Sequence, residues 1–445
     1  MASQFRKHLS ITGLLKIVHK FFITVSDPRA LRKNTVPLID HLMSGLAVFG
    51  LKCPSLLAYE RGRFETATAQ NLHNLYYIGT PPSDTYLRER LDEVSPDALR
   101  PVFKKIFAEF QRGKGLEGFE FLDGHILMSG DGTGQFASNK ICCPQCCKKN
   151  HKNGTTSYYH QMFGVCIVHP DKSNVIPLCP EPILNQDGSE KNDCERNACK
   201  RFLENFRREH PHLKVILLED GLSSTAPNIS MIERCNMKYI LVAKPGDHQF
   251  LFKQLEANDE VIYHDVTTED GRYHQFRFLN GISLNKSNQD VQVNFIEYRM
   301  TDLKGKELNF SWVTNIPISK SNALKIAIGG RARWKVENET FNTLKNLGYN
   351  FAHNYGHGKQ YLSTIFCMLM MLAFLIDQIQ AICCTLFQGC KKRLGTYRDL
   401  WNSMRSLFRL ITFYSWENFY QTMSNKQPYQ DTSYGGARIL FYTIN

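Results

Sequence analysis

Two segments of the chain each place an aspartate beside a glycine after a run of apolar residues. Asp131 follows ILMSG and precedes Gly132, whereas Asp220 follows LKVILLE and precedes Gly221. Active groups of open α/β sheets lie beyond the ends of strands, where the loops diverge and solvent can enter. Two carboxylates that meet there repel each other, and a divalent cation relieves the repulsion. Taken singly, each aspartate is equally consistent with a turn or a helix cap.

A third carboxylate, Glu337, lies on the apolar side of a helix predicted over residues 331–348. The apolar stripe of this helix consists of Trp334, Phe341 and Leu344. Glu337 falls on the same stripe by helical spacing, and a carboxylate that faces a core needs a metal ion or a cation. Arg333, one turn earlier, is the alternative partner. Glu339 lies well round the helix and is predicted to face solvent.

Two aspartates and a glutamate can hold two Mg²⁺ ions about 4 Å apart, with Mn²⁺ as an alternative metal. Such a pair polarises a phosphodiester, activates a water or a 3′-hydroxyl, and stabilises the leaving oxygen during in-line attack. Gly130, Gly132 and Gly134 would then allow a phosphate backbone to approach Asp131 closely. The three acids therefore indicate a phosphoryl-transfer site.

A cysteine cluster follows in CCPQCCKKNH, residues 142–151. The candidate metal ligands there and just beyond are Cys143, Cys146, His151 and His160. Two thiolates and two imidazoles form a tetrahedral Zn²⁺ site, so the pattern predicts a zinc knuckle over 141–160. A hairpin with free thiols is the alternative, because a second CxxC pair is missing. His353 and His357, in HNYGHG, are interpreted as polar core groups, with metal ligation or DNA contact as alternatives.

The elements that must position these residues alternate between strand and helix patterns. Two short strands are predicted within 119–132, the second ending at Asp131, and further strands are predicted over 158–169, 175–180, 213–221 and 238–247. The strands up to 180 are typical of an antiparallel meander, whereas the last two are apolar runs typical of strands buried on both faces. A helix is predicted over 192–210. Strand–helix–strand crossovers give parallel strands, so we expect an α/β fold with a mixed sheet flanked by helices.

The remaining segments differ in pattern from this core. The predicted regions are a helical N-terminal DNA-binding region (1–112), the first part of a catalytic domain (113–247), a β-rich insertion (248–317), a second catalytic part that carries Glu337 (318–385) and a helical, basic C-terminal tail (386–445). The N-terminal region is alternatively a helical cap on the next domain. Ser83 or Asp84, and then Ser95, are predicted to begin helices there. The apolar run 362–376 is too short to span a membrane and is predicted to be a buried core helix.

Three motifs resemble, in order and spacing, the acidic motifs of insertion-sequence DDE transposases. They are GDGT at 130–133, LEDG at 218–221 and RWKVENETF at 333–341, and NLGYNFAHNYGHGKQ at 346–360 continues the resemblance. The likeness covers about 119–380. The long gap before Glu337 is similar to that of one branch of the family, which has a β-rich insertion in an RNase H-like fold and a Tyr-x2-Arg-x3-Glu-x6-Lys signature. Arg333 and Glu337 match this signature, whereas Gly330 and Leu344 stand at the Tyr and Lys positions and Lys345 comes one residue late.

The resemblance implies that Asp131, Asp220 and Glu337 are the catalytic, Mg²⁺-binding residues of a cut-and-paste DNA transposase. Such an enzyme cleaves the terminal inverted repeats of its element and joins the freed 3′-hydroxyl to target DNA, acting as a homodimer in a synaptic complex. Residues expected to contact DNA are Arg333, Lys345, Lys244, Lys148 and Lys149. The alternatives are an RNase H-like, metal-dependent nuclease without strand transfer and a non-catalytic zinc-knuckle DNA-binding protein.

The composition agrees with a nucleic-acid partner. The 445 residues include 54 Lys and Arg against 42 Asp and Glu, a net charge of +12, and 42% of them are hydrophobic. The basic excess favours a polyanion, either nucleic acid or an anionic membrane surface. The first 25 residues lack the pattern of a secretory signal, and 14 cysteines are then expected to be reduced or to bind metal. We expect a cytoplasmic protein at the nucleoid, with no membrane partner.

Overall fold

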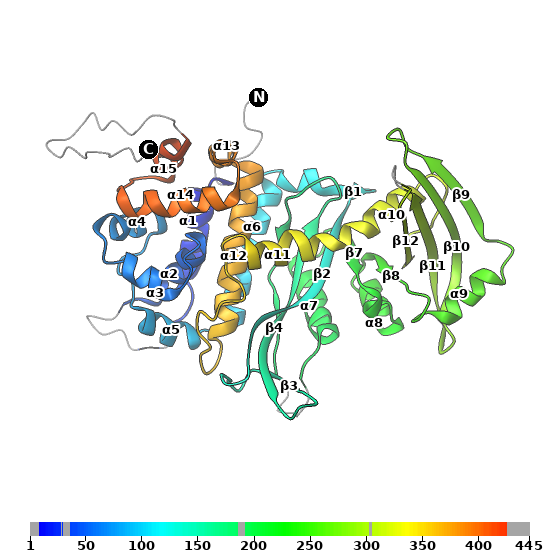
Figure 1. Cartoon of the computed structure of the whole chain (residues 1–445), viewed down its shortest axis with the longest axis horizontal. Helices are drawn as coiled ribbons and strands as arrows, with labels where there is room; N and C mark the ends of the chain where they lie inside the picture. Colours follow the sequence, from blue (N-terminus) through cyan, green and yellow to red (C-terminus); the bar gives the residue numbers. More distant parts are fainter. Residues whose placement is uncertain (1–8, 28, 30–35, 186–191, 302–304, 425–445) are drawn as a thin grey trace.

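The computed structural model describes residues 9–27, 29, 36–185, 192–301 and 305–424. Helices gather at one end of the molecule, a mixed sheet with flanking helices forms its middle, and long antiparallel strands lie at the other end (Figure 1). The chain is therefore of the mixed α/β class. The last part of the predicted C-terminal tail, 425–445, lies outside the described residues.

The N-terminal region is helical throughout its described part. Its helices are α1 (Ile11–Phe22), α2 (Leu38–Gly50), α3 (Leu56–Gly62), α4 (Thr66–Tyr76), α5 (Asp84–Asp92) and α6 (Pro96–Arg112). Serine side chains begin several of them. Ser83 accepts a hydrogen bond from the backbone N–H of Tyr86 and so caps α5, and Ser95 precedes Pro96 at the start of α6. These starts follow the usual preference for Ser before a helix and Pro in its first turn.

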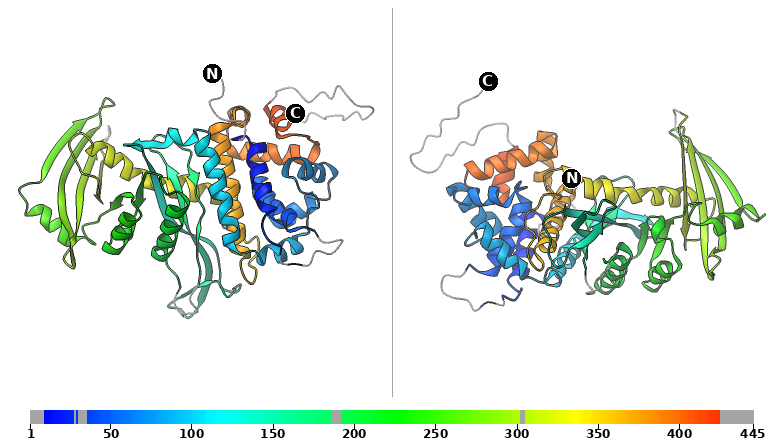
Figure 2. Two further views of the ribbon diagram at one scale, coloured as in Figure 1. Left: turned by 180° about the vertical axis from the view of Figure 1, so that it is seen from behind. Right: turned by 60° about the horizontal axis from the view of Figure 1, so that its bottom comes forward.

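The C-terminal helices pack against the N-terminal ones and form a single helical body with them (Figure 2). They are α12 (Leu362–Cys383), α13 (Thr385–Leu394), α14 (Tyr397–Leu410) and α15 (Trp416–Ser424). Asn71 of α4 donates hydrogen bonds to the carbonyl oxygens of Phe408 and Ile411, at 2.9 and 2.7 Å. A Cβ on Gly45 of α2 would lie 2.7 Å from Leu369 Cδ1 of α12. Segments more than 300 residues apart in sequence therefore share one core.

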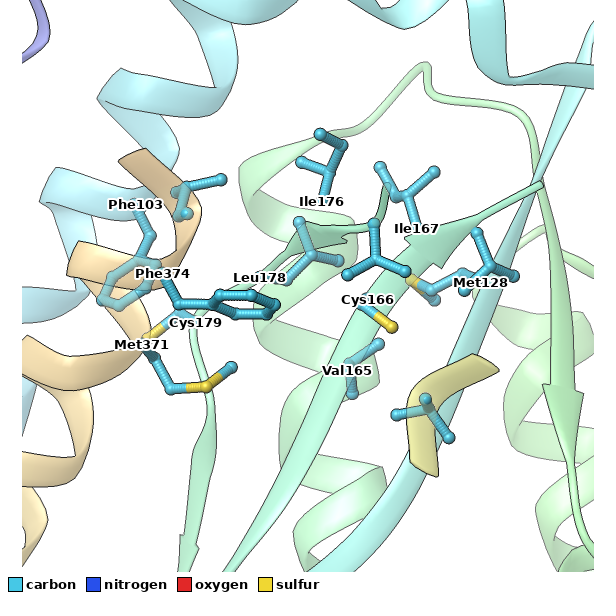
Figure 3. Packing of buried hydrophobic residues seen from close by; sticks show 14 of the residues in the cluster. Phe103, Met128, Val165, Cys166, Ile167, Ile176, Leu178, Cys179, Met371 and Phe374 are labelled. Atoms are coloured by element: carbon cyan, nitrogen blue, oxygen red, sulfur yellow. The ribbon is translucent and has the colours of Figure 1, made fainter. Parts of the chain in front are cut away.

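Helix α12 is the central helix of this body and also covers the sheet. It is long and apolar enough to cross a membrane, but 89% of its most apolar stretch of 18 residues is buried inside the fold. The helix runs past the predicted end at residue 376. Met371 and Phe374 lie beside Leu178 and Cys179, and Phe103 of α6 joins the same apolar layer (Figure 3). Burial against the protein accounts for the hydropathy of this helix.

A twelve-stranded sheet runs through the rest of the described residues. Its strands are β1 (Glu120–Leu122), β2 (His125–Ser138), β3 (Cys147–Asn150), β4 (Thr156–Val168), β5 (Ile176–Pro177), β6 (Glu181–Ile183), β7 (Val215–Glu219), β8 (Lys238–Val242), β9 (Ile262–Thr267), β10 (Tyr273–Asn285), β11 (Asn288–Thr301) and β12 (Glu307–Thr314). The order along the main path is β3-β4-β2-β7-β8-β12-β11-β10-β9, and β1, β5 and β6 pair at its side. β2, β7 and β8 are parallel, whereas β2 and β4 are antiparallel. The sheet is therefore mixed.

The parallel strands are connected by helices. η2 (Gly115–Phe119) precedes β1, α7 (Glu195–Glu209) precedes β7, and η3 (Gly221–Ser223) with α8 (Ala226–Arg234) connects β7 to β8. All five residues of β7 are buried, as expected for an apolar strand covered on both faces.

Residues 248–317 extend this sheet. They contain α9 (Gln249–Glu256) and the strands β9 to β12, and β12 pairs antiparallel with β8. Because hydrogen bonding continues from β8 into β12, the inserted strands are a continuation of the central sheet. Figure 2 shows them at the end of the molecule opposite the helical body.

The helical run that carries Glu337 is longer and less regular than the helix predicted over 331–348. It consists of α10 (Ala323–Arg331), the 3₁₀ turn η4 (Ala332–Trp334), the π-helical turn η5 (Val336–Phe341) and α11 (Asn342–Asn346). A 3₁₀ turn is wound tighter than an α-helix and a π turn more loosely, so side-chain directions shift along the run. Figure 1 shows this run crossing from the inserted strands towards α12.

Candidate active site and cysteine–histidine cluster

Asp131 lies midway along β2, just past the point where its parallel pairing with β7 stops, and Asp220 directly follows the last residue of β7. The predicted strand end at Asp131 is wrong, because β2 continues to Ser138 in antiparallel pairing with β4. The last registered pair between β2 and β7 is Ser129 with Leu218, and each aspartate follows two residues later. Side chains alternate along a strand, so both carboxylates share one level and one face of the sheet. Asp220 also accepts a hydrogen bond from the backbone N–H of Leu222 at 3.0 Å. Asp220 is therefore also the cap of the turn that follows β7. The hydrogen bond uses only Oδ1, so the second carboxylate oxygen remains available to a metal ion.

Arg333 connects Glu337 to Asp131. Its Nη1 lies 3.3 Å from Asp131 Oδ2, and its Nη2 lies 2.8 Å from Glu337 Oε1. One guanidinium thus spans both carboxylates and holds a residue of β2 against the π-helical turn. Arg333 is the ionic partner of Glu337 that the helical spacing left as an alternative.

The predicted apolar stripe is wrong at two positions. Trp334 is 44% exposed, and the side chain of Glu337 is 49% exposed, whereas Val336 and Phe341 are buried. Glu339, expected in solvent, is half-buried. The cause is the 3₁₀ and π geometry, because a spacing of 3.6 residues per turn no longer gives the direction of a side chain there. Glu337 is consequently open to solvent and to a ligand.

Glu195, the first residue of α7, is a fourth carboxylate near Asp131 that no sequence motif indicates. Its Oε1 accepts a hydrogen bond from Gln161 at 2.9 Å, and a Cβ built on Gly132 would lie 2.0 Å from the same oxygen. Burial, and then the charge of Asp220, raises the pKa of Glu195. Acidic residues in a first helical turn are ordinarily explained by the helix dipole, so the sequence position carried no signal of its own.

A pocket of about 520 Å³ opens beside Asp131 and Asp220. Asp131, Glu195 and Asp220 all line it, whereas Glu337 is not part of its lining and joins the group through Arg333. Burial raises the pKa of Asp131 to about 6, although its neighbour's backbone N–H and Arg333 act to lower it. The charges of Glu337 and Glu195 add to the increase. Burial first, and the neighbouring negative charges second, therefore favour the protonated form of Asp131.

The glycines beside Asp131 leave room for protein side chains. A Cβ on Gly130 would lie 2.6 Å from Phe163 Cζ, and one on Gly132 would overlap the carboxylate of Glu195. Within the described residues, nothing lies within 4 Å of a Cβ on Gly134. The expectation that these glycines admit a phosphate backbone is therefore wrong for the first two.

Packing explains two departures from the signature of the resembled branch. A Cβ on Gly330 would lie 2.5 Å from Trp312 Cε2, so a tyrosine has no room at this position. Leu344 is fully buried, whereas Lys345 is exposed on α11. In this chain, Lys345 can therefore make the contact expected of the signature lysine, whereas the buried residue 344 cannot.

Two of the other basic candidates, Lys244 and Lys148, lie next to segments that line the pocket. The Cε of Lys244 would be 3.6 Å from a Cβ on Gly221, so this lysine lies alongside the loop that follows Asp220. Lys148 and Lys149 are exposed on β3. The backbone of Lys148 exchanges hydrogen bonds of 2.8 and 2.6 Å with the side chain of Asn192, which also lines the pocket.

A separate group of side chains that could bind a metal ion lies beside the hairpin formed by the antiparallel strands β2, β3 and β4. Its members are Cys143, Cys146, His160 and His357, whose ligand atoms all lie within 4.8 Å of one another. His151 lies outside this group, because its Nε2 is hydrogen-bonded to Ser157 Oγ at 2.7 Å in an exposed part of the hairpin. The predicted ligand set is thus corrected by exchanging His151 for His357. His353 packs edge-on against Tyr355, with ring centroids 4.8 Å apart.

No protein-family model matches this chain, and no curated protein matches it either. A solved structure of a piggyBac transposase synaptic complex with hairpin DNA is similar over 97% of this chain and 84% of that chain, with a TM-score of 0.41 and 11% sequence identity. A likeness at this level carries no inference, so function has to be deduced from the two groups of side chains.

Proposed function

We propose that this chain is a metal-dependent DNA transposase of the DDE type. The observation that carries the proposal is the parallel pairing of β2 with β7, which brings Asp131 beside Asp220. Glu337 is tied to the same place through Arg333. Asp131 and Asp220 thus line one open pocket, and Glu337 is connected to Asp131 by Arg333, an arrangement that would suit phosphoryl transfer with divalent ions.

Asp131, Asp220 and Glu337, together with Glu195, would hold two Mg²⁺ or Mn²⁺ ions. The donor set suits these metals, which prefer carboxylate oxygens. The raised pKa values of Asp131 and Glu195 also support a cation, since they reflect burial together with nearby negative charge. When bound, the ions supply Lewis-acid activation of the phosphodiester and of the attacking hydroxyl.

The basic residues have distinct roles in this proposal. The Arg333 guanidinium can pass from the carboxylates to a DNA phosphate, whose two oxygens match its planar donors. Lys244 would meet a phosphate on the Asp220 side of the pocket. Lys148 and Lys149 on β3, with Lys345 on α11, would bind more distant stretches of the duplex. The net charge of +12 supports such extended contact with a polyanion.

We infer further that the central strands form an RNase H-like core. The order β5-β4-β2-β7-β8 places two antiparallel neighbours on one side of β2 and two parallel strands on the other. This order puts Asp131 of β2 next to Asp220, which follows β7. The partners would be terminal inverted repeats and target DNA, held by a homodimer in a synaptic complex.

The proposal is tested by incubating the full chain with Mg²⁺ and DNA taken from just outside its coding frame, where paired inverted repeats are expected. Cleavage at the repeat ends followed by joining to a target plasmid supports transposition. Cleavage without joining supports a nuclease instead, and a bandshift without cleavage supports a DNA-binding protein. Asp220→Asn should remove both reactions. Asp171→Asn is the matched control, because this aspartate has a side chain that is 88% exposed and is not part of the pocket lining.

A further inference from the structure

The cysteine–histidine group draws its members from three separate parts of the chain. Cys143 and Cys146 lie between β2 and β3, His160 lies on β4, and His357 lies between α11 and α12. The two sulfurs are 3.8 Å apart. His160 Nε2 lies 3.4 Å from the Cys143 sulfur and 3.6 Å from that of Cys146, and His357 Nε2 lies 3.1 Å from Cys146 Sγ.

These distances match the edges of a zinc tetrahedron. With Zn–S bonds of about 2.3 Å and Zn–N bonds of about 2.0 Å, tetrahedral geometry gives S–S edges of about 3.8 Å and S–N edges of about 3.5 Å. The observed S–S distance equals the first value, and the three S–N distances lie within a few tenths of an ångström of the second. Four of the six edges are thus close to those of a zinc tetrahedron, and all four ligand atoms lie within 4.8 Å of one another.

The surroundings of the group also suit a structural metal. Cys146 is fully buried, and His160 is 3% exposed. The backbone N–H of Cys143 points at the sulfur of Cys146 at 3.4 Å, which stabilises a thiolate there. The ring of Phe136 packs edge-on against His357, with centroids 5.2 Å apart. Cys143 and His357 are half-buried, and four protein ligands leave no open position for a substrate.

We propose that Cys143, Cys146, His160 and His357 bind a structural Zn²⁺ ion. The ligand types and the closed set of four are those of structural zinc sites. The inference does not depend on the proposed function, because none of these residues lines the carboxylate pocket.

The zinc ion would fasten the segment that follows the Glu337 helix. Residues 359–362 are held on one side by Asp92 at the end of α5, whose carboxylate accepts four backbone N–H bonds of 2.8 to 3.0 Å. His357 would be held on the other side by the metal on the β2–β4 hairpin. The ion therefore connects the helical body, the hairpin and the start of α12 at one junction.

The test is the metal content of the purified full chain, measured by plasma mass spectrometry after extensive dialysis. We expect close to one zinc ion per chain in the wild type. His357→Asn should lower this content at least severalfold, whereas His151→Asn should leave it unchanged. Cys142→Ser is a second control, since Cys142 adjoins the ligands but is exposed and not a member of the group.

Replacing the metal with Co²⁺ gives a readout that needs no variant. We expect the thiolate charge-transfer and d–d absorption bands of a tetrahedral site with two sulfurs and two nitrogens. A wild-type protein that is folded but binds neither zinc nor cobalt would overturn the proposal. Loss of zinc in His151→Asn, with retention in His357→Asn, would overturn the assignment of the fourth ligand.

Discussion

The carboxylate of Glu195 occupies the space that a side chain at residue 132 would need, since a Cβ on Gly132 would be 2.0 Å from its Oε1. Glycine at this position therefore allows an acid on α7 to stand against the strand that carries Asp131. The contact involves the end of a flexible side chain, so a larger residue at 132 can displace the carboxylate without disturbing the backbone.

The first prediction concerns this contact. Glu195→Gln and Gly132→Ala should each lower Mg²⁺ affinity about 10- to 100-fold, by neutralising or displacing a carboxylate next to the ions. Their effects should not add in the double variant, because both act through the same oxygen. Calorimetric titration with Mg²⁺ measures each affinity. Additive losses would show that the two residues act separately.

The second prediction separates chemistry from DNA binding. Asp131→Ala and Glu337→Ala should abolish cleavage while leaving the affinity for inverted-repeat DNA within about twofold, because the proposed contacts with DNA are made by Lys and Arg. Gel-shift and cleavage assays on the same preparations provide the comparison. Glu339→Ala is the matched control on the same helical turn and should cleave normally. Undiminished cleavage by either carboxylate variant would remove that residue from the mechanism.

The third prediction concerns a buried ion pair between α12 and the residue two positions past α2. Lys52 Nζ lies 2.6 Å from Asp377 Oδ2, and the lysine is also close to the rings of Tyr349 and Trp401. Asp377→Ala should lower the free energy of unfolding by about 3–5 kcal/mol, because it leaves a buried cation unpaired. The double variant Lys52→Met with Asp377→Leu should recover most of the loss. Urea unfolding measures the stability of the single and of the double variant. An Asp377→Ala protein as stable as the wild type would contradict a stabilising role of this ion pair.

The fourth prediction is a pH dependence of stability at the end of α7. Burial, with help from Lys104 and Arg207, lowers the pKa of His210 to about 4. The unfolded chain takes up this proton near pH 6.5, so the stabilising effect is complete above about 6.5 and is lost as the pH falls towards 4. The wild type should lose more unfolding free energy than His210→Gln between pH 7 and pH 4.5. Parallel pH profiles of the two proteins would contradict this.

The placement of Asp220 after a buried strand followed from the sequence, because an apolar run that ends in an acid and a glycine gives a local pattern. The same pattern was wrong for Asp131, since antiparallel pairing with β4 carries β2 on to Ser138. β7 is buried along its whole length, as its composition predicts. The helix start at Ser83 was also predictable, because the capping hydrogen bond joins residues only three apart in sequence. The extent of the sheet did not follow, since the pairing of β12 with β8 is a long-range contact.

The remaining differences have specific physical causes. The predicted direction of the Glu337 side chain was wrong because 3₁₀ and π turns interrupt the helical period. Glu195 and His357 could not be assigned because their partners are distant in sequence. His151 was the nearer histidine along the chain, but the hairpin turns it towards Ser157. Spacing predicts ligands only while the backbone between them is regular.

The most direct test of the central claim is the binding of Mn²⁺, followed by electron paramagnetic resonance in the full chain with repeat DNA. We predict tight binding by the wild type and by Asp171→Asn, and binding at least tenfold weaker in Asp220→Asn, because Asp220 would be a direct ligand. Equal Mn²⁺ affinity in all three proteins would contradict the claim that Asp131, Asp220 and Glu337 form a metal site.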